Sequence, residues 1–85
     1  KMSWRKFATH AEETKAVKAA LTEAHIPFRS VGHGRGTAWA WLEINLGPLP
    51  DPSAYSVLRA LVLRVVLPLT GRDGDNNGQI GILAQ

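Results

Sequence analysis

The sequence contains no cysteine. This absence excludes disulfide bonds, thiolate catalysis and zinc–thiolate sites, and it favours a reducing compartment, so we expect a cytoplasmic protein. The chain also lacks an apolar run long enough to span a bilayer. Its most apolar stretch, residues 57–69, is short and is interrupted by Arg59 and Arg64. We therefore expect no membrane association.

Acidic residues are scarcer than basic ones, seven against ten, and the formal net charge is +3. The excess is uneven. Residues 1–36 carry seven basic and three acidic side chains, whereas residues 37–85 carry three basic and four acidic ones. A mild positive charge in the first part of the chain is compatible with a polyanionic partner, although ordinary solubilising charge explains it equally well.

The length leaves room for one small hydrophobic core. A chain of 85 residues buries roughly 60–65% of its unfolded surface, which is enough for a single domain. We expect residues 1–85 to form that domain, with residues 1–8 as an N-terminal arm. The apolar share of 45% is that of a globular protein, since disordered chains are poorer in aliphatic residues.

Start and stop signals divide the chain into five elements. Thr9 and Glu12 have the spacing of a capping box, and Asp51 followed by Pro52 is typical of a helix start. We expect Pro68 to end the second helix, because proline removes a backbone donor. The predicted elements are a helix over 10–24, strands over 28–32 and 37–46, a helix over 52–67 and a strand over 79–83.

This order, α-β-β-α-β, predicts an α+β fold with two layers: a three-stranded sheet with two helices on one face. We expect the first strand to lie in the middle of the sheet, beside the last strand. On the second helix, the helical spacing predicts a buried stripe made of Ala54, Leu58, Leu61, Val62 and Val65.

The strand predicted over residues 37–46 sorts its side chains by period-two alternation. Trp39, Trp41 and Glu43 face one side. Because an apolar helix lying over Glu43 would desolvate its carboxylate, we assign the tryptophan side to solvent or a partner. The opposite side faces the core and carries Ala38, Ala40, Leu42, Ile44 and Leu46.

Two indoles at i and i+2 on an open sheet form a platform on which nucleic-acid bases stack. Arg29 lies on the neighbouring strand, and the glycine-rich loop between the strands carries His33 and Arg35, which suit phosphate. We therefore predict a small non-catalytic domain that binds single-stranded nucleic acid. The alternative is a protein-interaction module, as a homodimer or an inhibitor of a host defence complex, because tryptophan and arginine are enriched in interface hot spots. In the plainest interpretation the tryptophans only pack.

The remaining motifs give weaker predictions. Asp73, Asp75 and Asn77 match the first half of a calcium loop, but Ala84 stands where the bidentate glutamate belongs. A turn is therefore the preferred interpretation of this segment. The three histidines show no metal-ligand spacing, and no Ser-His-Asp arrangement can be assembled. We expect no metal, cofactor or catalytic site.

Two segments resemble patterns of a known family: GRGTAWAWLEI over residues 34–44, and TGRDG over residues 70–74 followed by GQI over 78–80. They are similar to small domains of the large polyvalent protein-associated type, found in phages and other mobile elements. Ala40 departs from the pattern, which has glycine there. The resemblance implies a mobile-element or bacterial cytoplasmic setting without catalytic activity. It adds Arg72 to the predicted anion contacts, with a salt bridge to Asp73 or Asp75 as the alternative. The matching positions are Gly34, Arg35, Gly36, Thr37, Trp41 and Arg72.

Overall fold

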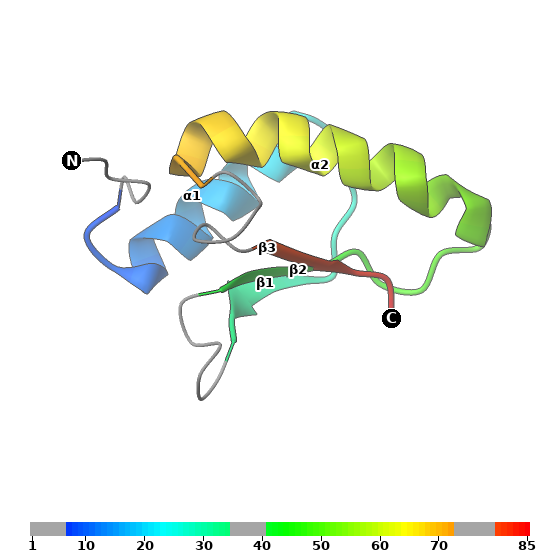
Figure 1. Cartoon of the computed structure of the whole chain (residues 1–85), viewed down its shortest axis with the longest axis horizontal. Helices are drawn as coiled ribbons and strands as arrows, with labels where there is room; N and C mark the ends of the chain where they lie inside the picture. The colour runs from blue at the N-terminus through cyan, green and yellow to red at the C-terminus, as the bar shows by residue number, and fades with distance from the viewer. Residues whose placement is uncertain (1–6, 35–40, 73–79) are drawn as a thin grey trace.

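The computed structural model describes residues 7–34, 41–72 and 80–85, and these form two layers (Figure 1). Both helices lie on one face of a three-stranded sheet, so the predicted α+β architecture is confirmed. The elements in chain order are α1 (His10–Glu23), β1 (Ser30–His33), β2 (Leu42–Asn45), the 3-10 turn η2 (Pro52–Ala54), α2 (Tyr55–Thr70) and β3 (Ile80–Leu83).

β2 is the central strand of the sheet. It pairs antiparallel with β1, which brings Ile44 opposite Val31, and parallel with β3, which brings Ile44 opposite Ile82. The prediction that the first strand lies in the middle is therefore wrong. The centre is the part of a sheet that the helix layer covers best, and β2 carries the two fully buried strand residues, Leu42 and Ile44. The strand with the two most buried side chains thus takes the most covered position.

α1 begins where the capping box predicts. The side-chain oxygen of Thr9 accepts a hydrogen bond from the backbone N–H of Glu12 at 3.1 Å. The buried face of the helix contains Glu13, Val17 and Leu21, which are spaced one turn apart. A carboxylate among these aliphatic residues needs a partner inside the fold.

α2 starts as predicted but ends later. The Asp51 side chain accepts a hydrogen bond from the N–H of Ser53, and Pro52 follows it in η2. The helix then continues through Pro68 to Thr70, so the prediction that this proline ends the helix is wrong. A proline in the last turn removes only one donor, and the chain leaves the helix at Gly71, whose left-handed φ of 78° lets its N–H bond to the carbonyl of Leu67.

The buried stripe of α2 is rotated from the predicted one. Val62, Val66 and Thr70 are fully buried, whereas Leu61 is 39% exposed, which contradicts its predicted place in the core. Val62 was assigned correctly, and the predicted Leu58 and Val65 are partly buried and pack against the core.

The helical segment Pro52–Thr70 is 19 residues long with a mean hydropathy of 1.4, and by length and composition alone it is apolar enough to cross a membrane. This corrects the expectation that the apolar stretch is too short. Core helices of soluble proteins can satisfy the same criterion, although only 17% of this segment is buried in the structure. The Tyr55 hydroxyl donates to the carbonyl of Ile82 in β3 at 2.6 Å, and Val62 and Val66 enter the core.

Candidate functional site

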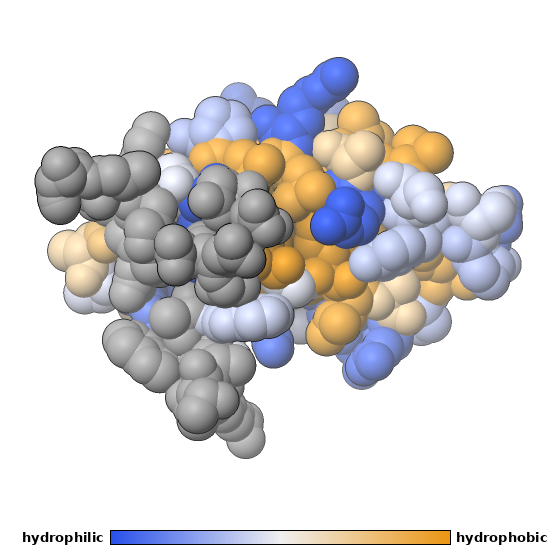
Figure 2. All heavy atoms as spheres, in the orientation of Figure 1, coloured by the Kyte–Doolittle hydropathy of each residue, from blue (hydrophilic) through white to orange (hydrophobic). Residues whose placement is uncertain are grey.

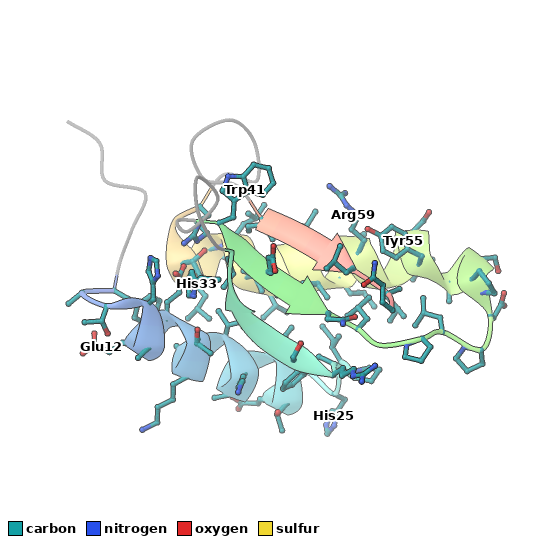
Figure 3. The ribbon with its side chains drawn as sticks, turned by 90° about the horizontal axis from the view of Figure 1, so that it is seen from below. Glu12, His25, His33, Trp41, Tyr55 and Arg59 are labelled. Carbon is teal, nitrogen blue, oxygen red and sulfur yellow. The ribbon has the colours of Figure 1, made fainter. Side chains whose placement is uncertain are left out.

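The structure divides the predicted site residues between the two sides of the sheet. Trp41 lies on the open side, where Figure 3 shows it beside the upstream end of β2. His33 and Arg72 lie on the helix side, and Arg29 lies at the far end of β1. The other predicted positions fall outside the described residues: Arg35, Trp39, Asp73, Asp75 and Asn77.

The open face of the sheet, defined here by Trp41, Glu43, Gly32 and Gly81, follows the predicted alternation over the described part of β2. Leu42 and Ile44 are buried, while Trp41 is 40% exposed and Glu43 is exposed. This agrees with the assignment of the aliphatic side to the core and the tryptophan side to the outside.

Glu43 stands on this face between two glycines. Gly32 of β1 and Gly81 of β3 are its cross-strand neighbours. A Cβ placed at Gly32 would meet no atom within 4 Å, and one at Gly81 would only touch Glu43 Cγ at 3.9 Å. Among the described residues no ion pair involves Glu43. The open face is therefore flat around one accessible carboxylate with an indole two residues away.

The other end of the open face is occupied by structural hydrogen bonds. The Asn45 side-chain oxygen accepts from the backbone N–H of Gly47 at 2.9 Å and of Gln85 at 3.1 Å. Arg29 donates from Nη1 to the carbonyl of Gln85 at 3.3 Å. Arg29 pairs with the Asn45 end of β2, four residues from Trp41, so roughly 13 Å of strand separates them. The structure does not bring Arg29 to the indole.

On the helix side, Glu13, His33 and Arg72 form a buried cluster. Arg72 binds Glu13 with two hydrogen bonds, from Nε to Oε2 at 2.7 Å and from Nη2 to Oε1 at 2.9 Å. His33 Nε2 lies 2.9 Å from Glu13 Oε1. Glu13 and Arg72 are each 2% exposed. The cluster therefore joins α1, β1 and the segment after α2 at one buried point.

The imidazole of His33 is held from three sides. With Nε2 donating to Glu13, its Nδ1 faces the Thr14 hydroxyl at 3.4 Å as an acceptor. The ring of His10 stacks on it with centroids 3.9 Å apart and planes within 5°. His33 is a strand residue of β1 whose ring is fixed inside the fold, so the prediction that it serves in the glycine-rich loop is wrong.

Burial raises the pKa of Glu13, but the hydrogen bonds and charge of Arg72, together with the hydrogen bond of His33, outweigh burial and hold the pKa below its ordinary value of 4.5. The ionised carboxylate and the guanidinium then neutralise each other. This corrects the prediction that Arg72 is a surface anion contact. Arg72 forms a salt bridge with Glu13 of the first helix. The partners that the alternative expected, Asp73 and Asp75, lie outside the described residues.

Glu13 is the residue that sequence reasoning missed. Its signal is its position: it precedes Val17 by four residues and Leu21 by eight, so it lies on the buried stripe of α1. A charged residue at such a position predicts a buried ion pair. The partner could not be identified in the same way, because Arg72 lies 59 residues further along the chain.

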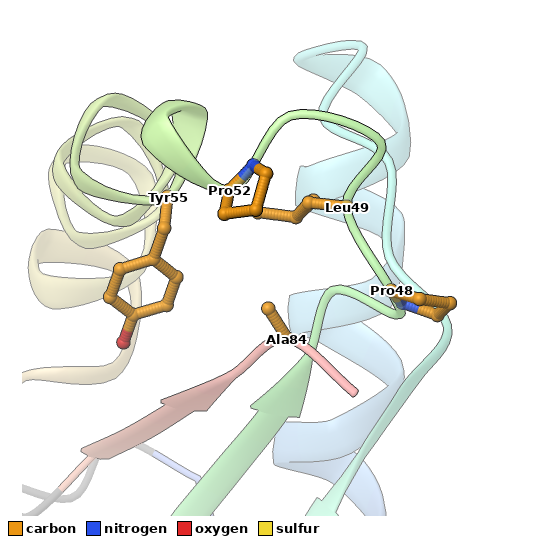
Figure 4. A pocket seen from close by; sticks show the side chains of 5 residues that line it. All are labelled: Pro48, Leu49, Pro52, Tyr55 and Ala84. Carbon is orange, nitrogen blue, oxygen red and sulfur yellow. The ribbon is translucent and has the colours of Figure 1, made fainter.

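Several shallow hollows in the described part of the chain lie outside these sites. One, of about 500 Å³, is lined by proline, leucine, alanine and tyrosine side chains at the carboxyl ends of β2 and β3 (Figure 4). A second, of about 350 Å³, runs along α2 itself. Within the described ranges no group of three histidine or acidic side chains could hold a metal ion.

No family model, curated protein or solved structure matches this chain. The resemblance to domains of the large polyvalent protein-associated type therefore stays a prediction.

Proposed function

We propose that this domain binds a protein partner through the open face of its sheet. The observation that carries this proposal is Glu43, an exposed carboxylate in the middle of that face, two residues from the exposed indole of Trp41. Trp41 supplies apolar area and Glu43 supplies charge, which is the combination that suits a basic side chain of another protein.

Charge supports a protein over a nucleic acid. A phosphate backbone lying on the open face would meet Glu43 with no described basic residue beside it. Two of the residues predicted to contact phosphate, His33 and Arg72, are buried around Glu13. Arg29 lies at the opposite end of the strands from Trp41. A polyanion would thus face repulsion where binding through Trp41 requires attraction.

The same geometry favours a lysine or arginine as the contacting group. The bare backbone of Gly32 and Gly81 leaves room for the aliphatic stem of such a side chain across the sheet. Its charged end then meets the Glu43 carboxylate while the stem or guanidinium lies on the Trp41 ring. A flat or extended segment of the partner suits this face because Gly32 and Gly81 add no side chain beside Glu43.

The test compares two probes of opposite charge on the full chain. A labelled arginine-rich peptide and a labelled oligo(dT) are titrated by fluorescence anisotropy against wild type, Trp41→Ala, Glu43→Gln and Glu43→Lys. We expect the peptide to bind wild type, to weaken roughly tenfold with Trp41→Ala or Glu43→Gln, and to lose binding with Glu43→Lys.

Glu23→Gln is the matched control, because Glu23 is also exposed but lies at the end of α1. It should leave peptide binding unchanged, and circular dichroism should be the same for all variants. If instead oligo(dT) binds with a steep dependence on salt and Glu43→Lys strengthens that binding, the domain binds nucleic acid and the proposal is wrong.

A further inference from the structure

The outer stripe of α2, defined here by Ser56, Val57, Ala60, Leu61 and Arg64, lies on the side of the helix away from the core. These residues line the 350 Å³ groove along the helix. They follow the i, i+3, i+4 spacing of one helix face, opposite the buried Val62, Val66 and Thr70. Because α2 belongs to the helix layer, this stripe is separate from the open face of the sheet (Figure 1).

The outer stripe exposes large apolar side chains to solvent. Val57 is 63% exposed and Leu61 is 39% exposed. They are two of the four large hydrophobic side chains that are exposed in the described part of the chain. Figure 2 shows apolar side chains reaching the surface at the level of α2, interrupted by strongly hydrophilic ones. Ala60, between the two aliphatic residues, is small enough for another helix to approach closely. The stripe thus has the shape and composition of a helix-docking groove.

The charges of α2 are all of one sign. The helix carries Arg59 and Arg64, both exposed, and no acidic residue over its 16 positions. Arg64 lies at one end of the stripe, one turn from Ala60 and Leu61, where its guanidinium can meet a carboxylate on a docked helix. Arg59 lies on the flank toward β3, beside Tyr55 (Figure 3).

We propose that the outer stripe of α2 docks an amphipathic helix from a protein partner, with its apolar face on Val57 and Leu61 and its acidic residues facing Arg64. The partner is identified by this chemistry: leucine-like anchors at helical spacing, flanked by glutamate or aspartate. The proposal does not depend on what the open face of the sheet binds.

Two other occupants fit less well. A second copy of this chain would present the same arginines and no carboxylate from α2, so its charge does not complement the stripe. An anionic membrane would attract Arg64, but Val57 and Leu61 together bring fewer carbons than one myristoyl chain, which by itself gives only marginal membrane binding. A helix with matched apolar and acidic residues can contact Val57 and Leu61 and also pair with Arg64.

The test uses three pairs of labelled helical peptides, each of roughly 18 residues and alanine-rich so that the helix forms. The pairs differ in the position of their leucines, and the members of a pair differ only in flanking residues, glutamate in one and lysine in the other. Binding to the full chain is measured by anisotropy. We expect at least one glutamate peptide to bind, with affinity reduced about tenfold by Val57→Ser/Leu61→Ser and about three- to tenfold by Arg64→Glu.

The decisive observation is a charge exchange. Arg64→Glu should gain binding to the lysine peptide of the same register, whereas the matched control Arg59→Glu, with the same charge change on the flank, should not. All these positions are exposed, so circular dichroism should be unchanged.

Three results would overturn the proposal. One is the failure of all glutamate peptides to bind. Another is stronger binding to vesicles of phosphatidylcholine and phosphatidylserine than to any peptide, which assigns the stripe to a membrane. The third is a dimer in light scattering that Val57→Ser/Leu61→Ser dissociates, which assigns it to a second copy.

Discussion

Glu13 and Glu43 are carboxylates on opposite sides of one sheet, and their surroundings differ in every property that sets their role. Glu13 is 2% exposed and receives hydrogen bonds from Arg72 and His33. Glu43 is exposed, stands between two glycines and has no ion pair within the described part of the chain. One carboxylate holds the fold together, and the other is available to a partner.

The difference follows from the cost of burying charge. A carboxylate taken out of water is tolerated only with a close counter-charge and filled hydrogen-bond positions, and Arg72 supplies both to Glu13. A carboxylate left in water needs no such partner, and so Glu43 contributes little to stability. Charge on the inside therefore determines folding stability, whereas charge on the open face belongs to the surface for which we propose a binding role.

The largest expected effect is that of Glu13→Gln. The substitution keeps the shape of the side chain but removes the buried charge that Nε and Nη2 of Arg72 bind, which costs about 3–5 kcal/mol of unfolding free energy. Glu43→Gln should change the unfolding free energy by less than about 0.5 kcal/mol. Urea unfolding followed by circular dichroism measures both, and equal losses would contradict the comparison.

A loss of this size is close to the whole stability of a small domain, about 5–15 kcal/mol, so the single variant can unfold. The double variant Glu13→Gln/Arg72→Met keeps the test informative. It removes both charges and should recover part of the loss, because an apolar side chain replaces the buried guanidinium. No recovery would mean that the ion pair is not the cause.

The loss of the Glu13 charge should also be visible in the pH dependence of stability. Because the pKa of Glu13 is lower in the fold, its stabilisation is present above the ordinary value of 4.5 and is lost as the pH falls through the folded pKa. Urea midpoints measured from about pH 7 to about pH 3 should therefore fall for wild type and change less for a folded variant without Glu13, such as the double variant.

Asp51 is the control for this profile. Hydrogen bonds from the Ser53 hydroxyl and backbone N–H lower its pKa, so Asp51 acts in the same direction from a fully exposed position. Asp51→Asn should flatten the acid limb less than removal of Glu13. A larger flattening with Asp51→Asn would place the acid sensitivity at the start of α2 instead of in the buried cluster.

The smallest expected effect belongs to the open face. Gly32→Ala adds a Cβ that meets no atom within 4 Å, so thermal unfolding should shift by no more than the equivalent of about 0.5 kcal/mol. Gly47→Ala is the contrasting variant, because Gly47 has a φ of +84° and its Cβ would lie 3.5 Å from Arg29 Cβ. It should cost roughly 1–2 kcal/mol. A larger loss at Gly32 would mean that the open face is packed.

Local signals account for the parts of the fold that sequence predicted well. The Thr9 cap, the Asp51–Pro52 helix start and the alternation that separates Trp41 from Leu42 each depend on residues a few positions apart. Pro68 shows the limit of such rules, since the left-handed turn at Gly71 allows the helix to run past it. The end of α2 is set there by the C-cap at Gly71 and not by the proline.

The strand order and the buried cluster depend on contacts between distant segments. β3 takes its place beside β2 only through the path of α2, which no short motif encodes. Glu13 meets Arg72 across 59 residues, and the same arginine resembles a surface anion contact when considered with its neighbours alone. The candidate site was therefore half predicted. Alternation predicted the outward direction of Trp41 and Glu43, whereas no local pattern predicted that His33 and Arg72 are directed into the fold.

The bond from Tyr55 to Ile82 affects how the sheet ends. Successive carbonyls of a strand point to opposite sides, and because the carbonyl of Leu83 accepts from Leu46 beside β2, that of Ile82 points outward. The phenol already occupies this outward acceptor. A strand of another molecule that pairs with the outer edge of β3 would have to displace the Tyr55 ring. The sheet is therefore protected at Ile82 against the addition of a fourth strand.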